Sequence, residues 1–175
     1  MAQLLMKLPN LGGFQAGARS DLRLADKRDT AGLDRLLALA FPELEWSEGR
    51  ASKDLFEDTS VAAVYVIEGP EGLLATASAL YHAPFPGVGY VHWVGVDPAA
   101  RGQALGTAVM AAVLARFVAD GFSAAVLETD DPRLPAITSY LAQGFVPQYP
   151  EAGHEERWSN AFAAIAAWRT SKRKG

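Results

Sequence analysis

The segment that decides the fold runs from Val94 to Thr107 and reads VGVDPAARGQALGT. It begins with β-branched residues, meets the pair Asp97–Pro98, and from Leu105 onward spaces its apolar residues as a helix does. Proline cannot continue a β-ladder, and glycine allows a tight loop in which the backbone can approach a ligand. The segment therefore predicts a strand, a short loop and the first turn of a helix.

This predicted turn is a candidate anion-binding site. Free N–H groups at the start of a helix point outward along the positive end of the helix dipole, so they can hold a pyrophosphate. These groups belong to Gln103, Ala104, Leu105, Gly106 and Thr107, while Arg101, next to Gly102, can add a charge-assisted contact. A Walker loop would need a Lys–Ser/Thr pair after the glycines, and a Rossmann turn would need G-x-G-x-x-G after the first strand. Neither pattern is present.

The residues before this segment predict mainly antiparallel strands. The expected strands are residues 22–24, 61–67, 73–81 and 90–96, with a hairpin turn at residues 68–72. A helix is expected from Asp29 or Thr30 to Ala40, and a second short helix at residues 52–58. Residues 1–19 show no sustained period and predict a loose arm before a single domain of residues 20–175.

The residues after the segment alternate between helix and strand. A helix from Leu105 to about Gly121, a strand at 123–129, a helix that opens at Pro132 or Pro135, and a strand at 145–148 are expected. A last helix should bury Trp158 and its neighbours at helical spacing. This alternation is typical of parallel strands. The whole order predicts a mixed α/β fold, with a mostly antiparallel central sheet and helices on both faces.

The composition narrows the classes of function. The 175 residues are half apolar, carry a formal charge of -4 and include no cysteine, which excludes disulfides and thiol nucleophiles. An acidic chain is a poor match for the nucleic-acid backbone, so no nucleic-acid partner is expected. The opening apolar patch is too short for a signal peptide or membrane span, which predicts a cytoplasmic protein without a membrane partner. Three scattered histidines predict no metal site.

Two motifs resemble those of one enzyme family. Residues 101–106, RGQALG, resemble the Q/R-x-x-G-x-G/A acetyl-CoA signature of the GNAT superfamily of N-acetyltransferases. Residues 136–145, AITSYLAQGF, resemble the family's A-x-x-x-Y-x-x-x-G-F segment, and residues 127–136 and 156–158 resemble members related to mycothiol synthase. The resemblance covers roughly residues 20–170 and rests on two motifs in the expected order.

The resemblance implies a fold with splayed strands at the acetyl-CoA site and direct transfer to a primary amine. The pantetheine arm would pair with the backbone of Val94, Gly95 and Val96, whose N–H groups would polarise the acetyl carbonyl. Tyr140 matches the family's general acid, which protonates the departing thiolate. His92 lies two residues before Val94, hence on the same strand face, and is a candidate base. A structural histidine with an ordered water as base is the other interpretation.

Two positions depart from the family pattern. Ala104 replaces the middle glycine of the signature and adds a methyl group beside the phosphates. This methyl group either reduces the affinity for the cofactor or is tolerated, since alanine is expected to keep a normal helical backbone. Arg133 stands where the family often has asparagine, and it could meet a phosphate instead.

The acceptor is left open, with a small-molecule amine as the expected partner and a homodimer as a possible assembly. The competing interpretation is a non-catalytic domain that binds or senses acyl-CoA, against which Tyr140 argues. Aromatic residues either rim the acceptor side or simply cover the core; they are Trp46, Tyr81, His82 and Phe85.

Overall fold

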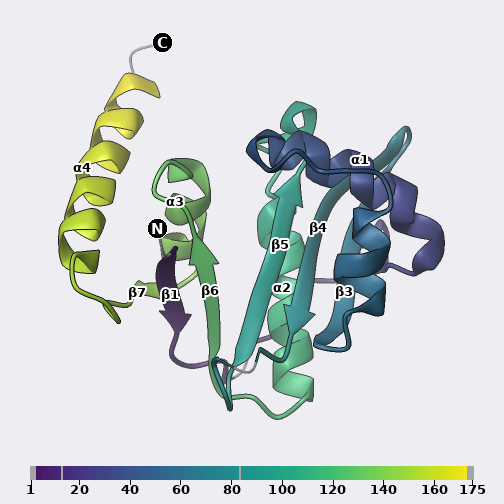
Figure 1. The fold of residues 1–175 in the computed structure, drawn as a ribbon, viewed down its shortest axis with the longest axis horizontal. Helices are drawn as coiled ribbons and strands as arrows, with labels where there is room; N and C mark the ends of the chain where they lie inside the picture. The colour runs from purple at the N-terminus through teal and green to yellow at the C-terminus, as the bar shows by residue number, and fades with distance from the viewer. Residues whose placement is uncertain (1–2, 13, 83, 173–175) are drawn as a thin grey trace.

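The computed structural model describes residues 3–12, 14–82 and 84–172, and its centre is a seven-stranded sheet in the order β2-β3-β4-β5-β6-β1-β7 (Figure 1). Within this sheet the β5–β6 pair is parallel and every other neighbouring pair is antiparallel. The strands are β1 Leu4–Leu8, β2 Leu22–Leu24, β3 Val61–Gly69, β4 Gly72–Leu80, β5 Gly89–Val96, β6 Ala125–Thr129 and β7 Val146–Pro147. The predicted mixed, mostly antiparallel sheet is confirmed.

Helices cover both faces of the sheet, as predicted. The helices are α1 Thr30–Ala40, α2 Leu105–Ala119, α3 Leu134–Ala142 and α4 His154–Lys172. Figure 1 shows α1 in front of the sheet and α2 behind it. Leu33 and Leu37 of α1 pack with Val66 of β3 in one buried cluster, whereas Val109 and Val113 of α2 belong to a second cluster. Residues Ser52–Glu57 form a π-helical turn where a short helix was predicted.

The C-terminal helix α4 lies at the outer side of the β1–β7 end of the sheet (Figure 1). It packs beside α3 and buries Trp158, Ala161 and Ile165 in the cluster that also contains Ile137. In the part of the chain that the structure describes, no helix is both long and apolar enough to cross a membrane.

The N-terminal segment is not a loose arm over its first residues, and that prediction is wrong for Leu4–Leu8. These residues form β1, which is inserted between β6 and β7 and pairs from Leu4↔Thr129 to Leu8↔Ala125. Leu4 and Met6 are fully buried. A stretch of five residues is too short to show a periodic pattern that would identify a strand. Its place in a sheet depends on the strands that pair with it. Residues 1–2 and 13 of the predicted arm lie outside the described residues.

The insertion of β1 also changes the predicted parallel tail. Because β1 separates β6 from β7, the strand after α3 pairs antiparallel with β1 through Met6↔Pro147 and Lys7↔Val146. The expected parallel direction therefore holds for β5, β6 and β7, but only β5 and β6 are hydrogen-bonded neighbours, because β1 lies between β6 and β7.

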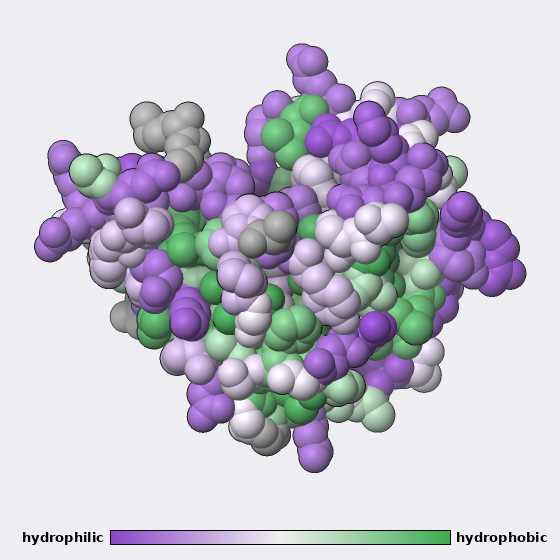
Figure 2. Space-filling view, turned by 60° about the horizontal axis from the view of Figure 1, so that its bottom comes forward, coloured by the Kyte–Doolittle hydropathy of each residue, from purple (hydrophilic) through white to green (hydrophobic). Residues whose placement is uncertain are grey.

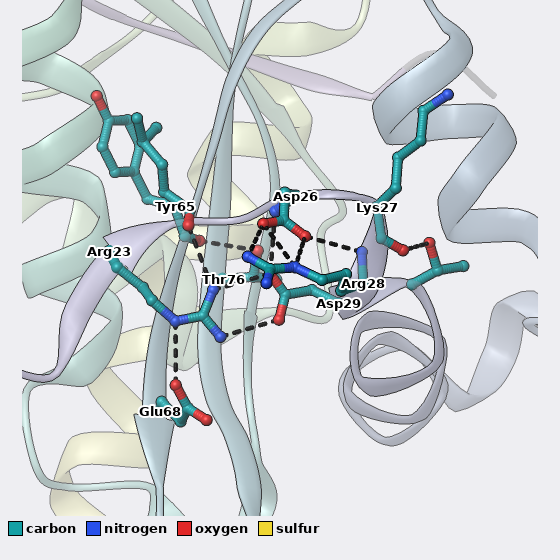
Figure 3. Close-up of polar contacts among 10 residues, drawn as sticks. Arg23, Asp26, Lys27, Arg28, Asp29, Tyr65, Glu68 and Thr76 are labelled. Atoms are coloured by element: carbon teal, nitrogen blue, oxygen red, sulfur yellow. Dashed lines mark hydrogen bonds and ion pairs between the residues drawn. The ribbon is translucent and has the colours of Figure 1, made fainter.

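Charged residues organise the 3-10 turn Lys27–Asp29 that immediately precedes α1 (Figure 3). Asp26 accepts from the backbone N–H of Arg28, and the Asp29 carboxylate accepts from the N–H of Asp26, which is a reciprocal capping box. Arg23 of β2 donates to Asp29 and to Glu68 of β3, so it ties this cap to the sheet. The hydrogen bond from the Arg28 guanidinium lowers the pKa of Asp26 to about 2. These ion pairs contribute little to stability individually, and the capping box closes the 3-10 turn Lys27–Asp29, which leads directly into α1.

Aromatic residues lie at the end of the sheet where β4 ends. The ring centroid of Tyr81 is 5.3 Å from that of Phe122, and the Tyr81 hydroxyl contacts Asp120. Figure 2, with the lower end of Figure 1 turned forward, shows apolar residues in the middle of this face and hydrophilic residues toward its margins. Through its contacts with Asp120 and Phe122, Tyr81 covers the C-terminal end of α2.

Candidate functional site

The parallel strands β5 and β6 separate part of the way along their length. Their pairing runs from Gly89↔Ala125 to Val91↔Leu127, although β5 continues to Val96 and β6 to Thr129. The predicted splay is confirmed. Beyond Val91, the edge of β5 that faces β6 has no strand partner among the described residues, so backbone groups of β5 are free to pair with an extended ligand.

A β-bulge lies in β5 opposite β4. The register passes from Ser78↔His92 to Thr76↔Gly95, so Trp93 and Val94 together face one residue of β4. Trp93 has a φ of 47°, the left-handed region that bulky residues rarely adopt. Its ring lies 4.7 Å from Trp46, on the α1 side of the sheet, whereas Val94 packs with the cluster that contains α2.

The bulge corrects the predicted position of His92. Spacing by two residues places side chains on one face only in a regular strand, and the extra residue breaks the alternation. The His92 ring lies 5.5 Å from Tyr90 and 4.5 Å from Trp93, so it does not share the face of Val94. Burial lowers the pKa of His92 to about 4, and the nearby His82 adds to the effect. The imidazole is therefore neutral at pH 7.

A cavity of about 370 Å³ opens where the strands separate. Its wall combines apolar, aromatic and charged side chains from β5, β6, α3 and the segment after α1. The lining residues are Gln3, Phe41, Leu44, Arg50, Val91, His92, Trp93, Val94, Leu127, Glu128, Thr129, Asp130, Arg133, Ala136 and Tyr140. Both predicted catalytic residues, His92 and Tyr140, lie in this wall. The cavity is of the size that small-molecule sites have.

Tyr140 comes from α3 and is almost completely buried. Burial raises its pKa to about 12, which the nearby charge of Arg133 partly offsets, so the phenol remains protonated at neutral pH. Among the described residues its hydroxyl has no hydrogen-bond partner, and it is free to donate to a group in the cavity. This is the protonation state that a general acid needs.

The beginning of α2 presents free backbone donors. The first helical bond runs from Ala108 N–H to the Ala104 carbonyl, and Arg101 N–H donates to Pro98. Between them, the N–H groups of residues 102–107 have no protein acceptor in the part of the chain that the structure describes. Arg101, Gly102, Gln103 and Ala104 are exposed. The loop therefore presents the free donors that the predicted anion site requires, and anion binding itself stays a prediction.

Ala104 does not keep a normal helical backbone, and that expectation is wrong. It is the N-cap of α2 and has φ 56° and ψ 21°, in the left-handed region, while Gly102 has φ 84°. Alanine is strained there because its Cβ crowds the following carbonyl oxygen. The preference for glycine at this position of the signature therefore follows from the left-handed backbone conformation, and not from a need for space beside a phosphate.

Two other glycines of the segment serve packing. A Cβ on Gly95 would lie 3.2 Å from the Cβ of Ala40, and one on Gly106 would lie 3.3 Å from Cγ2 of Val96. Gly95 allows the end of α1 to approach β5, and Gly106 allows α2 to approach the same strand.

Arg133 lies at the cavity and not in the loop of residues 101–107. Its Nε donates to Asp130 at 3.1 Å, its Nη2 contacts Glu43, and its guanidinium lies 4.3 Å above the ring of Phe41. A contact from Arg133 to a phosphate stays a prediction.

Arg50 is a cavity residue that sequence reasoning missed. Its guanidinium lies 4.3 Å from the ring centroid of Trp46 and 5.4 Å from that of Trp93, and its Nε donates to Asp54 at 2.9 Å. Its position depends on a bulge in β5 and on a loop after α1. The sequence around this arginine predicts neither the bulge nor the conformation of the loop, so its place in the cavity could not be predicted.

Asp34 anchors the loop that carries Arg50. This buried carboxylate of α1 accepts from Trp46 Nε1 at 2.8 Å and from the backbone N–H groups of Gly49 and Ala51 at 2.6 and 2.7 Å. Three donors on one carboxylate hold residues 46–51 in place over the sheet.

Of the two interpretations of the aromatic residues, the structure favours core cover, since Trp46, Tyr81, His82 and Phe85 are all absent from the cavity wall. Trp46 packs against the cluster of α1 and contacts the cavity residue Arg50. The rings of His82 and Phe85 lie 4.7 and 5.7 Å from Tyr90, and cover it. Across the described ranges, no three His, Asp or Glu side chains are grouped so that they could hold a metal ion.

Comparisons with known proteins agree with this geometry. A family model described as Acetyltransferase (GNAT) family matches residues 33–145. A mycothiol acetyltransferase of Arthrobacter sp. (strain FB24) is 39% identical over 64 residues, which is 37% of this chain and 20% of that protein. The match to a second mycothiol acetyltransferase, from Sanguibacter keddieii, covers 19% of it, so the chain spans about a fifth of the length of these curated relatives.

Solved structures share the fold. An acetyltransferase of the GNAT family from Novosphingobium aromaticivorans has a TM-score of 0.64 at 19% identity, over 85% of this chain and 61% of that one. A GNAT family acetyltransferase from Brucella melitensis, solved in complex with acetyl-CoA, has a TM-score of 0.56 at 20% identity, over 74% of this chain and 88% of that one.

Proposed function

Because the chain belongs to the GNAT family of acetyltransferases, we propose that it transfers the acetyl group of acetyl-CoA directly to a primary amine. The observation that carries the proposal is the opening between β5 and β6. There an unpaired strand edge leads into a cavity whose wall holds a protonated, unpartnered tyrosine, Tyr140.

The residues present suit acetyl-CoA. The free N–H groups of residues 102–107 can hold its pyrophosphate, and Arg101 is exposed beside them. The unpaired edge of β5 at Val94–Val96 can pair with the amide groups of the pantetheine arm, which leads the thioester toward the cavity. This fit adds the geometry of the loop and of the strand edge to the sequence signature.

The chemistry follows from the groups around the cavity. An acceptor that arrives as an ammonium ion first gives one proton to water, and the neutral amine nitrogen then attacks the thioester carbon. The carbonyl oxygen gains negative charge that a backbone N–H near Val96 can stabilise. The C–S bond then breaks, and the Tyr140 hydroxyl gives its proton to the thiolate. The nitrogen loses its extra proton to a base, for which neutral His92 in the cavity wall is a candidate. No acyl-enzyme is required.

Two measurements test the proposal. Acetyl-CoA should raise the melting temperature, since a ligand at a hundredfold excess over its Kd stabilises by about 2.7 kcal/mol. Thiol release should then appear when amines are added. Binding without thiol release from any amine would favour a non-catalytic acyl-CoA sensor, and the absence of a thermal shift with millimolar acetyl-CoA would remove the cofactor assignment.

A further inference from the structure

The charged side chains of the cavity differ in whether the protein already pairs them. Four charged residues line it, and they are Arg50, Arg133, Glu128 and Asp130. Arg133 pairs with Asp130 and Glu43, and Arg50 pairs with Asp54. Glu128 has no cationic partner among the described residues. It is the carboxylate that remains to balance a positive charge brought by a ligand.

Glu128 is held in a defined position. It lies in β6 immediately after Leu127, the last residue paired with β5, and therefore at the point where the strands separate. The Tyr90 hydroxyl donates to its Oε2 at 2.9 Å. Burial, reinforced by the charge of Glu128, raises the pKa of Tyr90, which therefore stays a donor. The second carboxylate oxygen is left for an ammonium group, which forms strong charge-assisted hydrogen bonds with carboxylates.

Arg50 offers the opposite charge from another element. Its Nε is occupied by Asp54, and its Nη1 makes a marginal contact of 3.5 Å with the Leu44 carbonyl, whereas no protein acceptor in the described part of the chain meets its Nη2. The guanidinium carbon lies over the Trp46 ring, 4.3 Å from its centroid, and together with Asp54 this ring holds the group in place. A planar fork held in this way is suited to a carboxylate.

The second arginine is a different case. Arg133 is met by the carboxylates of Asp130 and Glu43, which together balance more than its single charge. It closes the wall between α3 and Phe41 and has little attraction left for an anion. Among the described residues, the wall therefore offers Glu128, a carboxylate without a cationic partner, and Arg50, whose Nη2 donors remain free although its Nε is paired with Asp54.

We propose that the acceptor is a small amine that also bears a carboxylate, with its ammonium group at Glu128 and its carboxylate at Arg50. This inference rests on the proposed acetyl transfer. The cavity of about 370 Å³ also has to admit the thioester, so the part of the acceptor that enters it has about the size of an amino acid. Glu128 is thus a specificity residue that orients the nitrogen, and Arg50 selects the acid.

The test compares acid-bearing amines with their neutral amides. Alanine, 4-aminobutyrate and 6-aminohexanoate would each be paired with the corresponding carboxamide, which keeps the size and removes the charge. In the wild type, the best acid should exceed its amide in kcat/KM by about ten- to a hundredfold, the effect of one hydrogen-bonded charge. The member of the series with the largest ratio reports the spacing between the two binding groups.

Variants assign the effect to residues. Arg50→Gln should bring the acid-to-amide ratio close to one while the KM for acetyl-CoA stays unchanged. Glu128→Gln should raise the KM of the acid and of its amide by similar factors, because both bring an ammonium group. Arg28→Gln removes an exposed arginine from the cluster in Figure 3 and should change neither ratio nor KM.

The outcomes separate this inference from the proposed function. Equal kcat/KM for acids and amides in the wild type, or an Arg50→Gln variant that loses both equally, would overturn the acid-recognition assignment while amine acetylation stands. A Glu128→Gln variant with unchanged KM for the best acceptor would overturn the ammonium site. If acetyl-CoA binds and no amine of any kind releases thiol, the proposed transfer itself fails.

Discussion

The substitution Ala104→Gly should stabilise this protein although it removes a side chain. Ala104 is exposed at the N-cap of α2 with φ 56°, so its methyl group contributes little packing and strains the backbone. A non-glycine residue in this region costs about 1–2 kcal/mol. Glycine adds freedom to the unfolded chain, which lowers stability by about 0.4–1 kcal/mol. The net gain expected is about 0.5–1 kcal/mol.

The assay is thermal or chemical unfolding of the two proteins without ligand. For a domain of this length, about 1 kcal/mol corresponds to a rise in Tm of about 2–4 °C. Ala163→Gly is the matched control, because Ala163 is exposed in the middle of α4, where the same change should cost about 1 kcal/mol. Affinity for acetyl-CoA should be equal or higher in Ala104→Gly. If both variants lose stability by similar amounts, the left-handed conformation of Ala104 and the origin assigned to the signature glycine are wrong.

Three further predictions concern the site. Arg101→Glu should weaken acetyl-CoA binding, because it places a like charge beside the pyrophosphate; normal binding by calorimetry would mean that the loop is misassigned. Tyr140→Phe should retain acetyl-CoA binding and lower turnover on the order of 10²–10⁴-fold, with a smaller loss for acyl donors whose thiols are more acidic; unchanged thiol release at saturation would exclude Tyr140 as the acid. His92 has a folded pKa of about 4, below its unfolded value, so the unfolded state takes up the proton first. Stability should therefore fall as the pH drops from about 6.5 toward 4, and His92→Asn should flatten this part of the pH–stability curve; identical slopes would contradict the burial of a neutral imidazole.

Local sequence patterns identified most of the secondary structure and the position of the loop before α2. The helix at residues 30–40 and the strand that ends before Asp97 are predictable, because apolar periodicity, caps and proline act within a few residues. The same holds for the helix that begins at Leu105 and its free N–H groups. The two family motifs led to Tyr140, whose burial beside the cavity follows from its place on α3.

Tertiary structure decided the features that depend on partners distant in the chain. Leu4–Leu8 is an internal strand because it pairs with β6 on one side and β7 on the other. The five residues alone do not predict this pairing. The bulge at Trp93 exists only in the pairing of β5 with β4, yet it turns His92 away from the face of Val94. Among the described residues, Glu128 lacks a cationic partner and the Nη2 of Arg50 lacks an acceptor, and both facts depend on which neighbours the fold places beside them. The physical reason is that backbone preferences are local, whereas strand register, side-chain facing and charge neutralisation are set by residues that approach one another only when the chain is folded.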